Sequence, residues 1–187
     1  MNVSIKRTVL NGRVKAPPSK SYSHRYLIAS MLSKNESEIS NIYFSDDILA
    51  TLNCISAFGR KYLKRINSVL FEKETIISEI PVFDCHESGS TLRFMIPISL
   101  SKYNHVIFKG TERLISRGIS VYEKIFKQQN IKIIKNSDSL EIIGHLRPGI
   151  FNVDGSLSSQ YITGLLFSLP LLDGDSVINI IPPLFSE

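Results

Sequence analysis

The sequence has little of what defines secreted, membrane or disulfide-rich proteins. Its two cysteines, Cys54 and Cys85, form neither a CxxC spacing nor a cysteine framework, so we expect a reduced, cytoplasmic setting. No apolar run comes near the roughly 18 residues of a membrane-spanning helix. Residues 1–14 carry positive charges without the apolar segment of a secretory signal. With 43% hydrophobic residues, the chain is expected to bury a core rather than stay disordered.

A metal site is not expected either. Cys54 lies in a helical apolar pattern that is typical of a core residue. The run Cys85-His86-Glu87 joins three ligand types, but adjacent residues do not match zinc spacings and no second cluster follows. The histidines show no pairing pattern and are interpreted as structural or surface residues: His24, His86, His105 and His145.

What the chain does have is positive charge. Lys and Arg number 22 against 17 Asp and Glu, which gives a formal net charge of +5. This balance favours an anionic partner, and composition alone leaves open a small phosphorylated molecule or a nucleic acid. An RNA-binding module is one alternative, but the aromatic residues are not interleaved with basic ones as a base-stacking platform requires.

Three stretches of the chain share one pattern, in which small Ser or Gly residues lead into an apolar helix. They are SKSYSHRYLIASML from Ser19, ESGSTLRFMIPISL from Glu87 and GSLSSQYITGLLFSL from Gly155. Ser21, Ser90 and Ser158 occupy similar places in them, separated by 69 (90 − 21) and 68 (158 − 90) residues. A repeat at a fixed period indicates stacked equivalent units.

A second helix is predicted after each of the first two stretches. The amphipathic patterns begin at Asp46 and Ser116, which are plausible N-caps. Gly59 and Asn130 are residues that adopt the left-handed conformation at helix ends.

Strand-like runs follow both of these helices. Residues 131–143 form two β-rich runs around an Asn-Ser-Asp turn, and residues 68–78 are a weaker counterpart. The predicted unit is therefore strand, helix, strand, helix and β-hairpin. We expect units at about 15–83, 84–150 and 151–187, the third of them incomplete.

The helix beginnings are where we expect the chemistry. The first four N–H groups of a helix lack partners within it, the dipole makes that end positive, and small residues let an anion approach. Ser21 and Arg25, which follow Lys20 in the sequence, are expected to share a helix face. Arg93 follows Gly89 by four residues. Ser158, Ser159 and Gln160 open the third helix. Each serine alone is more often a simple cap, but the repeated pattern predicts a site for a polyanion.

Four motifs resemble the 5-enolpyruvylshikimate-3-phosphate synthase (3-phosphoshikimate 1-carboxyvinyltransferase) family. PPSKSYSHR resembles its N-terminal signature, and SGSTLRF resembles its Gly-Thr/Ser-x-x-Arg segment. ERLISRGIS is similar to the segment with its phosphoenolpyruvate-binding arginine, and VDGSLSSQYITGLL to its Ser-Ser-Gln motif. The motifs occur in the family's order and cover essentially the whole chain. Departures from the family pattern are Glu87-Ser88 for Asn-Ala, and Phe94 and Gly118 where prolines are common.

The resemblance implies an α/β fold. The family has two lobes, each built from three βαβαββ units, with the active site between them. Residues 15–187 would form an inside-out α/β lobe with two complete units and a truncated third. Residues 1–14 would be a strand belonging to the other lobe, and the fragment alone is expected to be inactive.

The resemblance also implies roles for individual residues. Lys20 would be catalytic, contacting phosphoenolpyruvate and taking part in proton transfer. Shikimate 3-phosphate would be bound by Ser21, Arg25, Ser158, Ser159, Gln160 and Ser186. Phosphoenolpyruvate would be bound by Lys20, Gly89, Arg117 and Gln160.

The implied reaction moves the carboxyvinyl group of phosphoenolpyruvate to the 5-hydroxyl of shikimate 3-phosphate and releases phosphate, in the shikimate pathway to aromatic amino acids. It requires no metal or organic cofactor and no nucleic-acid or membrane partner, and the full-length parent is expected to be monomeric. The alternatives are a UDP-N-acetylglucosamine enolpyruvyl transferase-like protein, a basic RNA-binding module, or a mere folding or binding module. SKSYSHR and the Ser-Ser-Gln motif speak against the first of these.

Overall fold

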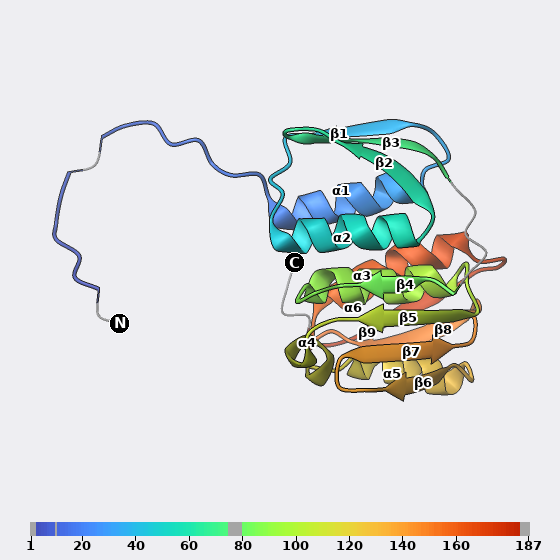
Figure 1. The fold of residues 1–187 in the computed structure, drawn as a ribbon. Coiled ribbons are helices and arrows are strands. Elements are labelled where there is room, and N and C mark those ends of the chain that lie inside the picture. The colour runs from blue at the N-terminus through green and yellow to red at the C-terminus, as the bar shows by residue number, and fades with distance from the viewer. Residues whose placement is uncertain (1–2, 10, 75–79, 184–187) are drawn as a thin grey trace.

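The computed structural model of the chain has helices inside and strands outside (Figure 1), and it describes residues 3–9, 11–74 and 80–183. The helices are α1 (Lys20–Leu32), α2 (Asp46–Ala57), α3 (Gly89–Leu100), α4 (Glu112–Ser116), α5 (Ser120–Gln128), α6 (Ser159–Ser168) and the short 3-10 helix η1 (Leu169–Leu171). The strands are β1 (Ser37–Ser40), β2 (Arg60–Lys64), β3 (Ser68–Glu74), β4 (Val82–Asp84), β5 (His105–Lys109), β6 (Lys132–Lys135), β7 (Ser139–Ile143), β8 (Ile150–Asp154) and β9 (Val177–Ile181).

Three separate sheets surround the inner helices, with strand orders β1-β3-β2, β4-β5-β7-β6 and β8-β9. The order β1-β3-β2 recurs as β5-β7-β6, antiparallel in both sheets. β4 lies parallel beside β5, as β8 lies beside β9. α1 packs on α2, α2 on α3, and α3 on α6, so the four helices line the interior. The expected α/β fold class is confirmed.

The first sheet differs from the second because the described residues contain no counterpart of β4 in it. Residues 1–14, expected to be a strand that belongs to the other lobe, have no helix or strand in their described part, 3–9 and 11–14. This stretch runs away from the rest of the chain (Figure 1), and Val3 and Val14 are 73% and 95% exposed. No described strand lies alongside it to receive its N–H and C=O groups, so alternating side chains alone do not produce a strand.

The helix ends agree in part with the sequence prediction. Gly59 and Asn130 have φ angles of 102° and 57°, which confirms the predicted left-handed ends. Asp46 is not a cap but the first residue of α2. Ser116 does not begin a helix but ends α4, because Gly118, with φ 72°, turns the chain before α5 starts.

The hairpin predicted at 131–143 is confirmed as β6 and β7. Its counterpart in the first unit lies earlier than predicted, between β2 and β3, where Lys64 pairs with Val69. The described part of the predicted run, Ser68–Glu74, is the single strand β3, which is the middle strand of its sheet and pairs on both sides; residues 75–78 of the run lie outside the described residues.

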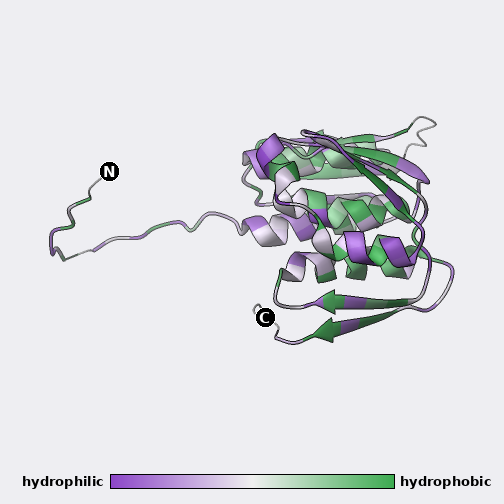
Figure 2. Cartoon of the chain, turned by 90° about the horizontal axis from the view of Figure 1, so that it is seen from below, coloured by the Kyte–Doolittle hydropathy of each residue, from purple (hydrophilic) through white to green (hydrophobic). Residues whose placement is uncertain are grey.

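The core is centred on α3. From Thr91 to Leu100 every α3 residue except Arg93 is buried, and Cys54 of α2 is fully buried as predicted. Figure 2 shows hydrophobic residues in the strands and inner helices, and a mixture along the extended N-terminal segment. Among the described residues, no helix combines the length and the apolar character that crossing a membrane requires.

Candidate functional site

The site is built from the beginnings of α1, α3 and α6. Their N-caps are Ser19, Ser88 and Ser158, whose side chains each accept a backbone N–H at 3.3–3.4 Å. These caps are 69 (88 − 19) and 70 (158 − 88) residues apart. The structural equivalents of Ser158 are therefore Ser19 and Ser88, and not Ser21 and Ser90 as the sequence pattern suggested, because Ser158 is itself the N-cap whereas Ser21 and Ser90 each lie two residues after theirs.

The predicted residue Gln160 ties α6 to α3. Its side-chain oxygen accepts a hydrogen bond from Arg93 Nη1 at 2.7 Å, and its Nε2 donates to Ser90 Oγ at 2.7 Å. The guanidinium of Arg93 also lies 5.3 Å from the centre of the Tyr161 ring. The orientation of the Gln160 amide is fixed by these contacts, since its oxygen meets a donor and its nitrogen meets an acceptor.

Gly164 allows α6 to come this close to α3, and Gly89 makes room for the Arg93 side chain within α3. A Cβ atom on Gly164 would lie 2.6 Å from the Arg93 carbonyl oxygen and 2.5 Å from the Tyr122 hydroxyl, which donates to that carbonyl. A Cβ atom on Gly89 would lie 2.9 Å from Arg93 Nη1. A side chain at position 164 would therefore prevent this approach of α6 to α3, whereas Gly89 leaves room for the Arg93 guanidinium of its own helix.

Arg25 of α1 reaches both of the other helices. Its guanidinium donates to the Ser21 carbonyl at 3.0 Å and to Thr163 Oγ1 of α6 at 3.3 Å. It also lies 5.4 Å from the ring centre of Phe94 on α3, a cation–π distance. The side chain is half-buried, so a fixed positive charge stands where the three helices meet.

Lys20 and Ser21 form the exposed first turn of α1. Lys20 Nζ lies 2.6 Å from Asp47 Oδ2 at the start of α2, and the two side chains are 57% and 30% exposed. The Lys20 ammonium therefore lies at the N-terminal ends of α1 and α2, with the Asp47 carboxylate beside it.

The remaining predicted residues make fewer contacts with the rest of the site. Ser158 and Ser159 are half-buried at the start of α6, and the Ser159 carbonyl accepts from Thr163. Arg117 is an exposed residue at the end of α4. Among the described residues it makes no hydrogen bond or ion pair to the other predicted site residues. Ser186 lies outside the described residues.

α4 nevertheless stands next to the beginning of α3. The Thr111 N–H donates to the His86 carbonyl at 2.8 Å, and its hydroxyl lies 3.3 Å from Glu87 Oε1. Leu114 approaches within 3.9 Å of the position that a Cβ atom on Gly89 would occupy. The helix that ends in Arg117 is thus fixed beside the Gly89 turn.

Sequence reasoning missed Thr163 and Phe94, the partners of Arg25. Thr163 is one helical turn after Ser159, so helical spacing was an available signal for it. His24 was interpreted as structural or surface and is buried, with its Nδ1 2.7 Å from Thr51 Oγ1. Burial lowers its pKa to about 4, opposed by Asp47 and assisted by Lys20 and Arg25.

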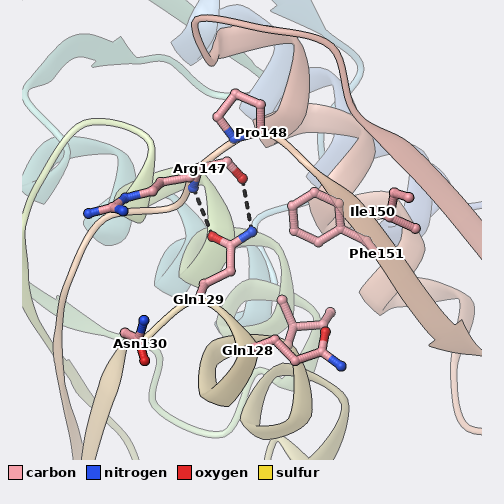
Figure 3. A pocket seen from close by; sticks show the side chains of 8 residues that line it. Gln128, Gln129, Asn130, Arg147, Pro148, Ile150 and Phe151 are labelled. Atoms are coloured by element: carbon pink, nitrogen blue, oxygen red, sulfur yellow. Dashed lines mark hydrogen bonds between the residues drawn. The ribbon is translucent and has the colours of Figure 1, made fainter.

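Two cavities bordered by described residues contain none of the predicted site residues. One of about 310 Å³ sits at the end of α5 and contains none of the predicted residues (Figure 3). There the Gln129 side chain donates to the Arg147 carbonyl at 2.9 Å and accepts from the Arg147 N–H at 2.8 Å. Another of about 300 Å³ lies beside the start of α1 and is lined by Ser19, Tyr22 and Tyr26 among others. Within the described ranges, no three His, Cys, Asp or Glu side chains gather as a metal site would require.

Several curated proteins similar to this chain carry the same name. A protein named 3-phosphoshikimate 1-carboxyvinyltransferase from Clostridium perfringens (strain SM101 / Type A) is 46% identical over 189 residues, covering 99% of this chain and 45% of that protein. A protein of the same name from Clostridioides difficile (strain 630) is 44% identical over 197 residues, with 95% and 44% covered. The chain thus spans less than half the length of these relatives.

The fold has solved counterparts. An EPSP synthase structure from Acinetobacter baumannii superimposes with a TM-score of 0.73 at 17% identity, over 92% of this chain and 41% of that one. At this identity the likeness supports the fold alone. The family model described as EPSP synthase (3-phosphoshikimate 1-carboxyvinyltransferase) matches residues 5–186. Nearly the whole chain is therefore accounted for by one family, and the chain belongs to the EPSP synthase family.

Proposed function

We propose that this chain supplies one side of the substrate site of a 3-phosphoshikimate 1-carboxyvinyltransferase. The proposal rests on the meeting of three helix beginnings, held together by Arg25 on Thr163 and by Gln160 on Ser90. Converging N-termini with a fixed guanidinium suit a ligand with several negative charges. Membership of the family supports the choice of reaction.

The roles proposed for individual residues follow the family pattern. Shikimate 3-phosphate is bound by Ser21, Arg25, Ser158, Ser159, Gln160 and Ser186. Phosphoenolpyruvate is bound by Lys20, Gly89, Arg117 and Gln160. Gln160 serves both because it stands between α3 and α6.

In the proposed reaction the 5-hydroxyl oxygen of shikimate 3-phosphate bonds to the central carbon of phosphoenolpyruvate while a proton adds to the methylene carbon. The hydroxyl loses its proton and a tetrahedral intermediate results. Loss of phosphate, with removal of one proton from the new methyl group, restores the vinyl group. Lys20 contacts phosphoenolpyruvate and takes part in proton transfer.

The domain assignment is part of the same proposal. Residues 15–187 belong to one lobe in three repeat units, at about 15–83, 84–150 and 151–187, and residues 1–14 belong to the other lobe. The relatives' greater length supports this division. We expect the chain alone to be inactive, because catalysis requires all the groups of the site to be placed together. The parent protein is proposed to be monomeric and cytoplasmic, without a nucleic-acid or membrane partner.

The test is a titration of the chain with shikimate 3-phosphate, followed by amide NMR shifts. We expect movement at Ser21, Ser158 and Ser159 with a millimolar dissociation constant, because ordering a free ligand offsets much of the contact energy. Arg25→Ala should weaken binding at least about tenfold, since a charge-assisted hydrogen bond contributes about 1.5–3 kcal/mol. Arg147→Ala, which alters an exposed arginine at the α5 cavity, is the matched control.

Two results would contradict the proposal. The first is that these amides do not move even at about tens of millimolar ligand and that Arg25→Ala changes nothing. The second concerns the expected inactivity: steady release of phosphate from phosphoenolpyruvate by the chain alone would show that it is a complete enzyme.

A further inference from the structure

A chain of buried side-chain hydrogen bonds joins α1 to α3 through α2. His24 Nδ1 lies 2.7 Å from Thr51 Oγ1, which lies 2.7 Å from Thr91 Oγ1, which in turn lies 2.7 Å from Ser88 Oγ. The four residues are between 0% and 1% exposed. Hydrogen bonds in such a dry interior are strong, and a polar group left there without a partner lowers the stability of the fold.

The donor count gives this chain a direction. Each hydroxyl has one proton, and a neutral imidazole has one N–H. If His24 donates from Nδ1 to Thr51, the Thr51 hydroxyl can donate onward to Thr91, and Thr91 donates to Ser88. Thr51 also lies 3.1 Å from the Asp47 carbonyl, an alternative acceptor within its own helix.

This direction agrees with the surroundings of the imidazole. His24 Nε2 is buried and has no hydrogen-bond partner among the described residues, so a second N–H there would find no acceptor. The charged groups that act on the ring are Asp47 of α2 and Lys20 and Arg25 of α1. Phe94 of α3 covers it edge-on at 6.4 Å between ring centres.

The two ends of this chain of hydrogen bonds lie near the beginnings of α3 and α1, which both belong to the site. Ser88 is the N-cap of α3 and directly precedes Gly89. His24 stands on α1 between Lys20 and Arg25. The half-buried contacts of Arg25 and Gln160 join α1 to α6 and α3 to α6, so the buried chain is the third side of a triangle.

We infer that His24, Thr51 and Thr91 are positioning residues that fix the first turn of α3 against that of α1 and thereby set the affinity of the anion site. This inference rests on the proposed function. The three side chains do not touch substrate in it. They act through Ser88, whose oxygen holds the Thr91 N–H at 3.3 Å, and through the backbone of α1.

The test uses Thr51→Val, which keeps the shape of the side chain and removes the middle hydroxyl. We expect amide exchange of Thr91 and Leu92 to become about tenfold faster, and the dissociation constant for shikimate 3-phosphate to rise three- to tenfold, since the network is broken at its centre. Thr51→Ser restores the hydroxyl and should restore both values. Ser99→Ala is the control, because it removes a buried α3 hydroxyl that bonds only to the Ile96 carbonyl of its own helix.

The outcomes separate the inference from the proposed function. If the unaltered chain binds shikimate 3-phosphate and Thr51→Val binds it equally well with unchanged Thr91 exchange, the positioning role is wrong. If the unaltered chain does not bind the ligand, the proposed function fails and the exchange measurement alone decides the link between α1 and α3. Should Thr51→Val not fold, Thr91→Val breaks the same chain from the α3 side, with the same expected results.

Discussion

The beginnings of α1 and α3 carry the same serine cap in the repeat but differ in their surroundings. Ser19 is exposed and follows a stretch without helix or strand, whereas Ser88 is 1% exposed and follows β4. At α3 the cap belongs to a buried hydrogen-bond network, while at α1 the first turn is held by an exposed ion pair. An identical local signal therefore starts both helices, but burial decides how firmly each start is held.

The largest expected effect concerns His24, the one α1 member of the buried chain. Its folded pKa of about 4 lies below the unfolded value, so the unfolded state binds the proton first as the pH falls. Stability from the neutral ring is complete above the unfolded pKa and is lost on acidification towards the folded one. Between about pH 7.5 and about pH 5 this loss is about 2 kcal/mol.

Urea unfolding of His24→Asn at both pH values measures this effect. The variant should lack the extra acid destabilisation, whereas His145→Asn, which alters an exposed histidine, should keep it. Equal losses in all three proteins would mean that α1 contributes no buried titratable group to the comparison.

The second effect compares the two caps directly. Ser88→Ala leaves the Thr91 hydroxyl and N–H without their buried partner and should destabilise the chain by about 1.5–2 kcal/mol. Ser19→Ala removes an exposed cap at 3.4 Å from the Tyr22 N–H and should cost only about 0.5 kcal/mol. Unfolding free energies of the two variants within error of one another would show that burial does not separate the two helix starts.

The smallest effect is expected at Lys20. Its ion pair with Asp47 is largely exposed, so Lys20→Gln should lower stability by less than about 1 kcal/mol, and only at low salt. Lys127→Gln on the exposed side of α5 controls for loss of a surface charge. A loss that persists at high salt would show that the first turn of α1 depends on this pair more than its exposure suggests.

Local features of the site and fold were predictable from the sequence. The serine-led helix starts, the hairpin of β6 and β7, and the left-handed Gly59 and Asn130 each depend on a few neighbouring residues. The repeat then allowed one unit to support the interpretation of the next. The break between α4 and α5 was missed although Gly118 marks it, because the apolar pattern continues across the turn.

What was not predictable depends on contacts between residues distant in sequence. Arg25 and Thr163 are 138 residues apart, and Thr51 and Thr91 are 40 apart. A threonine in an amphipathic helix gives no sign of whether its hydroxyl meets water or another helix. The strand proposed for residues 1–14 depends on the other lobe in the same way, since a strand needs another strand to accept its hydrogen bonds.

Gly164 has a consequence for the register of α6 along α3. It lies one helical turn after Gln160 on the same face of α6. A shift of α6 by one residue would bring Thr163 or Leu165 to the point where even a Cβ atom would overlap the Arg93 carbonyl. Both of these one-residue shifts are therefore disfavoured, and in the observed position the Gln160 amide meets Ser90 and Arg93. Gly164, which has no side chain, thus helps to set the position of the Gln160 side chain along α3.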